Sequence, residues 1–359
     1  MEGVFVQTSR LRTHCWVNGP EDGEPLLLVH GNLSTGRFWR AVAEQLPQNL
    51  RVVAPDLRSF GRSEQKGVDA SRGLRDWSDD LRALLEALGW ADQGRVHAAG
   101  WSMGGGILQQ YEIDHARDLA SLTLVAPLSP YGFGATKDAQ GTGNYDDFAG
   151  SGGGTAAPDF VNRLRAGDAS DDEPLSSPRV IMRNYFWSSA YKAPDEDELL
   201  AEVLLTAVGD EFYPGASTTS SNWPGVGPAP TGVNNAMSPK WCDTSAFGDV
   251  ASPAPVVWIR GTDDQVVSDG SLFDFGTLGK LGAVPGWPGD SVFPSQPMIA
   301  QIRAVFERRK THGGSVEEVV LEGVGHGPMI ERAPTVAQHI KQQASGFILS
   351  AAKDLRKRR

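Results

Sequence analysis

The run Arg95–Gly106, with the sequence RVHAAGWSMGGG, contains the only Gly-x-Ser-x-Gly motif in the chain, at residues 100–104. An apolar run precedes the motif and a helix-compatible segment follows, which is the context in which it forms a sharp strand-to-helix turn. Such a turn strains the serine, and small residues two positions on either side let the backbones pass closely. The hydroxyl then projects from the sheet beside the first amides of the helix. The motif predicts a nucleophile at Ser102; a glycine-rich structural turn is the alternative.

Short apolar runs alternate with amphipathic segments along most of the chain. Nearly continuous, β-branched runs followed by loops are typical of parallel strands buried on both faces. The predicted strands are 25–30, 51–56, 96–100, 121–126, 255–260 and 318–321, after a hairpin of 4–6 and 14–17. Between them, leucines recur at helical spacing, most clearly over 74–88. This alternation predicts an α/β fold with a doubly wound, mostly parallel sheet.

The alternation stops between residues 128 and 253. Residues 131–158 and 214–240 are rich in small and turn-forming residues and look like loops. Between them, one helix is predicted to begin at Ser177–Pro178, and a second to begin at Asp195 and end at Gly209. We therefore expect a core domain of residues 1–127 and 254–359, with an inserted, largely helical cap of residues 128–253 over the strand ends. A loose, disordered insertion is the alternative.

A serine hydroxyl is not ionised at neutral pH, so Ser102 needs a base. Among the seven histidines, His326 stands in a glycine-flanked loop directly after the last predicted strand. The loop can hold the imidazole over a neighbouring strand end, which makes His326 the candidate base. A surface loop histidine is the alternative interpretation.

The imidazole needs a carboxylate that fixes its tautomer. Two adjacent aspartates, Asp263 and Asp264, follow the strand 255–260, and their side chains must point in different directions. The Gly-x-x-Asp spacing from Gly261 favours Asp264, with Asp263 as a turn or cap residue. The loop after the preceding strand, Ala126–Pro130, offers no carboxylate.

An oxyanion hole is the remaining requirement of this chemistry. One donor is expected to be the backbone N–H of Met103, the residue after the nucleophile. The other is expected from the loop His30–Ser34, where the N–H of Asn32 is best placed. The side chain of Met103 is expected to pack in the core.

Charge, cysteine usage and missing motifs limit the partners, the redox state and the cofactors that we expect. The formal charge of −11 argues against nucleic acid and anionic membranes as partners. The two cysteines, Cys15 and Cys242, are far apart and are expected to stay reduced. No signal-peptide pattern, membrane-length apolar run, metal-ligand spacing or cofactor motif occurs, so we expect a cytoplasmic protein that needs no cofactor or metal.

The chain resembles the α/β-hydrolase superfamily over roughly residues 20–130 and 250–350. The resemblance is carried by five motifs in order: His30-Gly-Asn32, Asp56–Ser63, Gly100–Gly104, Gly261–Asp264 and Gly325-His326. It implies the nucleophile–acid–base order Ser102, Asp264, His326. The Asp56 segment has Ser59 where the pattern often has glycine, and we interpret that segment as structural. The long cap matches no subfamily.

The expected activity is cleavage of a small-molecule ester or lactone through an acyl-enzyme on Ser102. Dehalogenases and epoxide hydrolases of the superfamily are disfavoured because they use an aspartate where this chain has Ser102. An amidase or peptidase, a C–C bond hydrolase or an acyltransferase would use the same triad. A non-enzymatic small-molecule receptor is a further alternative. The apolar residues of the predicted cap favour a bulky, apolar substrate, whereas the oligomeric state stays open.

Overall fold

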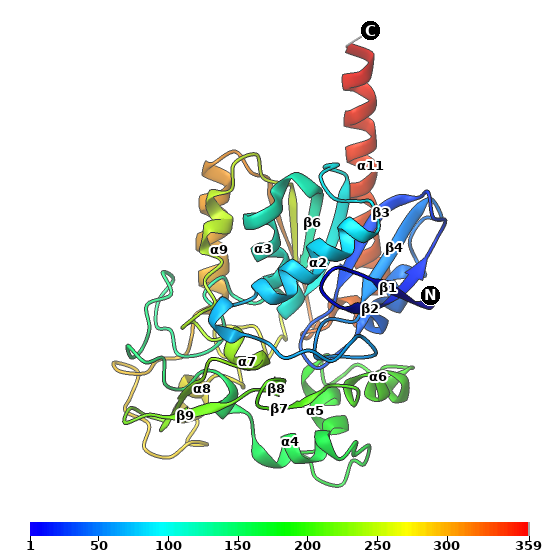
Figure 1. Cartoon of the computed structure of the whole chain (residues 1–359). Helices are drawn as coiled ribbons and strands as arrows, with labels where there is room; N and C mark the ends of the chain where they lie inside the picture. The colour runs from blue at the N-terminus through cyan, green and yellow to red at the C-terminus, as the bar shows by residue number, and fades with distance from the viewer. Residues whose placement is uncertain (358–359) are drawn as a thin grey trace.

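The computed structural model describes the backbone of residues 1–357 and the side chains of residues 1–345. Its central feature is one eight-stranded sheet with the order β1-β2-β4-β3-β5-β6-β11-β12 (Figure 1). The strands are β1 (Glu2–Gln7), β2 (Arg12–Asn18), β3 (Glu24–Val29), β4 (Leu50–Pro55), β5 (Val96–Trp101), β6 (Leu119–Val125), β11 (Val256–Gly261) and β12 (Val316–Leu321). Each predicted strand is present.

Strand direction follows the sequence pattern. β2 runs antiparallel to both β1 and β4, whereas every pairing from β4 across to β12 is parallel. The leading hairpin and the mostly parallel sheet are therefore confirmed.

The last strand corrects one expectation. β5 and β6 are buried along their whole length, as expected for central parallel strands. β12 lies at the edge of the sheet and is exposed at several positions, with Val320 46% exposed. The prediction that this strand is buried on both faces was wrong, because the side chains of Glu317, Glu318 and Val320 on this edge strand are exposed to solvent.

Helices cover both faces of the sheet. In Figure 1, α2 (Arg75–Ala87), α3 (Met103–His115) and α9 (Met298–Thr311) lie on one face. On the other face α11 (Ala333–Lys357) packs against β6, α10 (Pro328–Glu331) and α1 (Arg40–Ala43). The predicted leucine stripe of α2 is buried, so the doubly wound arrangement is confirmed. Within the described chain, no helix combines the length and apolarity that a membrane span requires.

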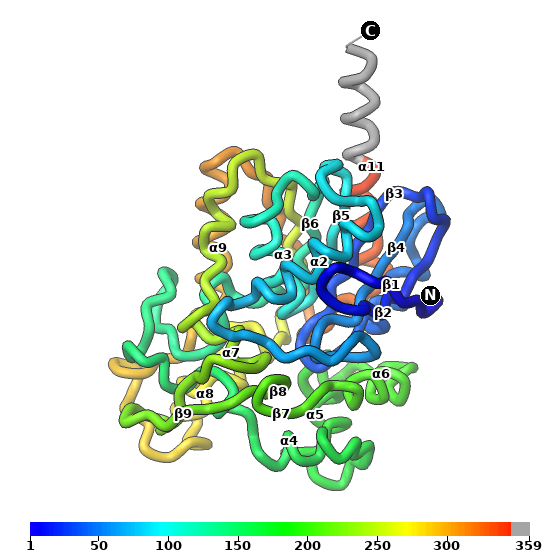
Figure 2. The backbone as a smooth tube through the Cα atoms, viewed as in Figure 1, coloured from blue at the N-terminus to red at the C-terminus, as the bar shows by residue number. Residues whose placement is uncertain are grey.

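Most of the segment between β6 and β11 lies below the sheet in the view of Figures 1 and 2, at the carboxyl ends of the strands, whereas its last part, Ser245–Asp249, packs against α9. Its elements are α4 (Pro158–Arg165), α5 (Pro178–Tyr185), α6 (Glu196–Val203), β7 (Val208–Gly209), β8 (Tyr213–Pro214), β9 (Ser217–Thr219), β10 (Val226–Pro228) and α7 (Val233–Ala236). Short strands and loops occupy much of it, so the expectation of a largely helical segment was wrong in that respect. The helix predicted from Asp195 ends at Val203, and Val208 belongs to a strand.

Backbone hydrogen bonds join this segment to the loop after β4. Ala207 N donates to Ser59 O at 2.9 Å, and Val68 N donates to Glu211 O at 2.9 Å. Gly232 N in turn donates to Val68 O at 3.0 Å. These contacts fix the inserted segment to the core through main-chain groups, unlike a loose insertion.

Ion pairs add a second attachment at α6. Arg40 binds Asp195 at 2.9 Å and Glu198 at 2.7 Å. Arg62 binds the two carboxylate oxygens of Glu202 at 2.8 Å each, and Glu202 is only 4% exposed. A bidentate ion pair of this kind fixes the relative positions of the two side chains and also stabilises the contact.

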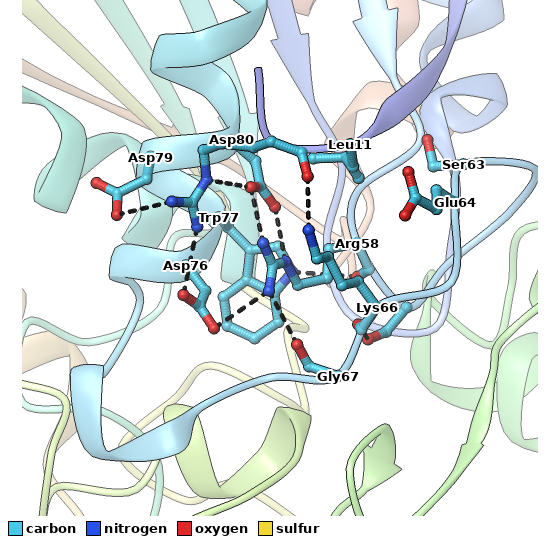
Figure 3. A network of polar contacts seen from close by, with 12 residues as sticks. Leu11, Arg58, Ser63, Glu64, Lys66, Gly67, Asp76, Trp77, Asp79 and Asp80 are labelled. Carbon is cyan, nitrogen blue, oxygen red and sulfur yellow. Dashed lines mark hydrogen bonds and ion pairs between the residues drawn. The ribbon is translucent and has the colours of Figure 1, made fainter. Parts of the chain in front are cut away.

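A buried charge network holds the loop after β4 in place (Figure 3). The guanidinium of Arg58 donates to both oxygens of Asp80 on α2, at 2.7 and 2.8 Å, and to Gly67 O at 2.9 Å. Arg10, from the turn between β1 and β2, donates to the same carboxylate at 2.6 Å. The network therefore anchors the loop one residue before Val68, which contacts the inserted segment.

Asp56, at the start of the same loop, is fully buried and binds the surrounding backbone. Its carboxylate accepts hydrogen bonds from Gly36 N and Arg62 N at 3.0 Å each, and His14 Nδ1 lies 2.8 Å away. Ser59 adopts φ +74°, a left-handed conformation that glycine adopts more easily. These contacts agree with the structural interpretation of the segment.

Candidate active site

The serine lies at a strained strand-to-helix turn. β5 ends at Trp101, α3 begins at Met103, and Ser102 between them has φ +54° and ψ −121°. Such values are costly for a residue with a side chain and concentrate at functional sites. Ser102 is half-buried, and its N–H and C=O are both held by bonds to Val125 O and Leu128 N.

The motif glycines are required by close backbone contacts. A Cβ on Gly104 would lie 2.4 Å from the carbonyl oxygens of Val29 and His30. A Cβ on Gly100 would lie 2.5 Å from Gly104 O. Only glycine lets α3 start this close to β3, as the turn requires.

The predicted base and acid are in contact. His326 Nδ1 lies 2.9 Å from Asp264 Oδ2, and both side chains are 4% exposed. The other oxygen of Asp264 accepts hydrogen bonds from Val266 N at 2.8 Å and Val267 N at 2.9 Å. Asp263 is exposed and accepts a hydrogen bond from its neighbour Thr262. Adjacent aspartates thus point apart, as the spacing predicts.

Two contacts that the sequence analysis missed hold the histidine loop. Trp101 Nε1 donates a 2.7 Å hydrogen bond to His326 O. Glu331 Oε1 accepts from Gly325 N at 2.7 Å, and the same carboxylate binds Ser188 N at 3.0 Å and Ser188 Oγ at 2.6 Å. Neither residue type is unusual in its local context, so no local signal could have found them.

Three other buried histidines are placed for structural roles. Burial lowers the pKa of His30 to about 4, and its Nε2 accepts a hydrogen bond from Leu57 N. Burial likewise lowers the pKa of His97 to about 4. His14, on β2, pairs with Asp56, which follows β4.

The segments that carry the two expected oxyanion donors lie against Ser102. Met103 is the first residue of α3, and its side chain is fully buried as expected. The loop after β3 passes against the serine, because a Cβ on Gly31 would lie 3.0 Å from Ser102 Cβ. Within residues 1–357, neither Met103 N nor Asn32 N donates to another protein group.

The apolar side chains of the inserted segment, which we expected to form a pocket wall, pack in two ways. Some lie against other aromatic rings, and others lie in the core. Phe186, after α5, contacts the ring of Trp101 with centroids 5.7 Å apart. Tyr213 packs against Phe160, with centroids 6.3 Å apart. Trp223, in the loop between β9 and β10, packs against Phe293, in the loops after β11, with centroids 4.8 Å apart. Leu200 is buried on α6, and Trp187 and Leu204 also pack in the core.

Within the described residues, no group of three or more His, Cys, Asp or Glu side chains could hold a metal ion. Cys15 and Cys242 are both buried and unpaired.

The sheet order, with its antiparallel second strand and a serine at the β5–α3 turn, defines a class of α/β domain whose catalytic groups follow the strands. A family model described as "Alpha/beta hydrolase family" matches residues 26–339, and the chain belongs to this family. The expected fold and superfamily are thereby confirmed.

Relatives and solved structures agree with the family. The chain is 35% identical over 124 residues to Lipase 1 of Psychrobacter immobilis, covering 34% of this chain and 38% of the lipase. It is 33% identical over 126 residues to 2-hydroxymuconate semialdehyde hydrolase of a Pseudomonas species, covering 34% of this chain and 42% of that enzyme. The matches therefore span less than half of either relative.

Among solved structures, esterase RhEst1 from a Rhodococcus species superposes with a TM-score of 0.59 at 17% identity, covering 97% of this chain and all (100%) of that one. At this identity the likeness concerns the fold alone. The relatives are hydrolases by name, which supports the prediction of a hydrolase.

Proposed function

We propose that this chain is a serine hydrolase that cleaves a carboxylic ester or lactone through an acyl-enzyme on Ser102. The observation that carries the proposal is the strained Ser102 at the β5–α3 turn, together with the 2.9 Å contact between His326 and Asp264. A serine in this position needs a base, and a histidine oriented by a carboxylate is the usual one.

The proposed mechanism uses these groups in the usual order of a serine, histidine and carboxylate triad. Ser102 Oγ attacks the acyl carbon while His326 Nε2 takes its proton, and Asp264 stabilises the imidazolium through Nδ1. The amides of Met103 and Asn32 stabilise the oxyanion, and each such donor contributes about 3 kcal/mol. His326 then protonates the leaving alcohol. Water, activated by the same histidine, releases the acid and restores Ser102.

We propose that residues 128–253 form a cap over the strand ends and that residues 1–127 and 254–359 form the core. Ligands of open α/β sheets bind at the carboxyl ends of the strands, where Ser102 and His326 lie. Phe186 supports an apolar pocket wall, because it packs against Trp101, the residue before the nucleophile. We therefore favour a bulky, apolar substrate. Cytoplasmic location stays a prediction.

Hydrolysis of amides, peptides or C–C bonds and acyl transfer would use the same catalytic groups. A receptor that keeps these groups but does not turn over its ligand is a further alternative.

A fluorophosphonate probe is expected to label Ser102, and Ser102→Ala is expected to lose both labelling and activity. Esters, lactones and amides of one acyl group then rank the bonds, and an acyl series from acetate to aromatic acids tests pocket size. Covalent mass on another residue would refute the nucleophile. Labelling without turnover would favour the receptor.

A further inference from the structure

The side chain of Asn32 links the expected oxyanion loop to the inserted segment. Its Oδ1 accepts a hydrogen bond from Leu33 N at 2.9 Å, and its Nδ2 donates to Asn234 Oδ1 at 3.2 Å. Leu33 has φ +53°, an unfavourable conformation for a leucine. The Asn32 side chain thus stabilises a strained turn at one end and contacts α7 at the other.

Asn234 is presented from a well-anchored position. The adjacent Asn235 is fully buried and uses its side chain to bind Gly153 N, Ala229 N, Ala216 O and Thr231 O. The start of α7 is also fixed to the core by the bond from Gly232 N to Val68 O. Asn234 therefore has a defined position relative to the core although it belongs to the insertion.

Tyr213 provides a second contact to Asn234. Burial raises the pKa of the Tyr213 hydroxyl, and a side-chain hydrogen bond with Asn234 acts in the opposite direction. The side chain of Asn234 therefore contacts both Asn32 and Tyr213.

We propose that Asn234 is a positioning residue for the oxyanion hole: by holding the Asn32 side chain, it sets the direction of the Asn32 backbone N–H beside Ser102. This inference rests on the function proposed above. Asn234 acts through Asn32 rather than on the substrate. Oxyanion donors act through their alignment with the charge that develops in the transition state. A less firmly held Asn32 would therefore reduce the stabilisation of the transition state more than it reduces substrate binding.

The test compares an oxoester with the matching thionoester, whose sulfur accepts hydrogen bonds poorly. Asn234→Ala and the nearly isosteric Asn234→Leu are expected to lower kcat for the oxoester about 10-fold, with KM within about 2-fold, and to reduce the oxoester preference. The pH profile of kcat/KM is expected to stay unchanged, because the His326–Asp264 pair is untouched.

Asn222→Ala is the matched control. Asn222 is also an asparagine of the insertion, but its side chain donates to Asp147 within the same segment. It is expected to retain the wild-type oxoester preference. Melting temperatures of all variants separate a loss of folding from a loss of alignment.

A double-mutant cycle isolates the route of the effect. If Asn234 acts through Asn32, Asn234→Ala added to Asn32→Ala is expected to cause little further loss. Asn32→Ala also tests the contact by itself if the Asn234 variants do not fold. Full additivity of the two substitutions would overturn the inference. An oxoester preference that is unchanged in the Asn234 variants would also overturn it, provided that the wild-type enzyme is labelled at Ser102. Absence of labelling in the wild type would instead refute the proposed function.

Discussion

The indole nitrogen of Trp101 donates a 2.7 Å hydrogen bond to the backbone carbonyl oxygen of His326. Trp101 is the residue immediately before the proposed nucleophile, and His326 is the proposed base. The bond joins positions 225 residues apart in the chain. It therefore sets the position of the histidine loop relative to the β5–α3 turn.

Replacement of this tryptophan is expected to impair catalysis as well as stability. Trp101→Phe leaves His326 O without its donor, which costs about 1–3 kcal/mol of unfolding free energy. We expect kcat to fall about 10-fold, because the imidazole is less well placed. Trp258→Phe is the control, since its buried Nε1 has no acceptor among the described residues. Equal kcat values for the two variants would contradict a role of the Trp101 bond.

The two adjacent aspartates are expected to differ strongly in effect. Asp264→Asn retains the shape but does not fix the same imidazole tautomer, so kcat is expected to fall by about 10⁴. Asp263→Asn is expected to have little effect, because Asp263 is exposed and binds only Thr262 among the described side chains. Steady-state kinetics with one ester measure both. The reverse ranking would show that the acid has been assigned to the wrong aspartate.

Glu331 is expected to hold the histidine loop against the insertion. Glu331→Gln places an amide where the carboxylate accepts hydrogen bonds from Gly325 and Ser188. We expect a loss of about 1–3 kcal/mol in unfolding free energy and a lower kcat. Ser188→Ala removes one donor and is expected to cost less. The exposed Glu317→Gln on β12 is the control. A stability of Glu331→Gln equal to that of Glu317→Gln would contradict this interpretation.

Stability is expected to depend on pH through Asp274. Burial raises the pKa of Asp274 to about 6 from an ordinary value of 3.8. Between these values the folded chain binds more protons than the unfolded chain, so this group lowers the unfolding free energy as pH rises from 4 to 6. Asp274→Asn does not titrate. The variant is therefore expected to gain about 2 kcal/mol relative to wild type between pH 4 and pH 7.

Urea unfolding at several pH values measures this difference. His30 and His97 contribute the opposite slope, because burial lowers the pKa of each to about 4 and the unfolded chain protonates first as pH falls. Their effect cancels when the two proteins are compared at each pH. A difference that does not change with pH would show that Asp274 does not titrate in this range.

The sequence by itself determined the features that depend on short-range chemistry. The strands follow from continuous apolar runs, and the turn at Ser102 follows from glycines that close backbone contacts require. The separation of Asp263 from Asp264 follows from the spacing after β11. The exposure of β12 was not predicted, because an apolar run does not reveal whether another strand lies beside it.

Only the tertiary structure decided the contacts between distant segments. The bond from Trp101 to His326, the carboxylate of Glu331 against Ser188 and the amide of Asn234 against Asn32 leave no local pattern. Helix α6 ends at Val203 although apolar residues continue to Val208, because the chain beyond it pairs with the loop after β4. Local preferences define each element, whereas the positions of the catalytic loops depend on hydrogen bonds formed after the insertion packs on the core.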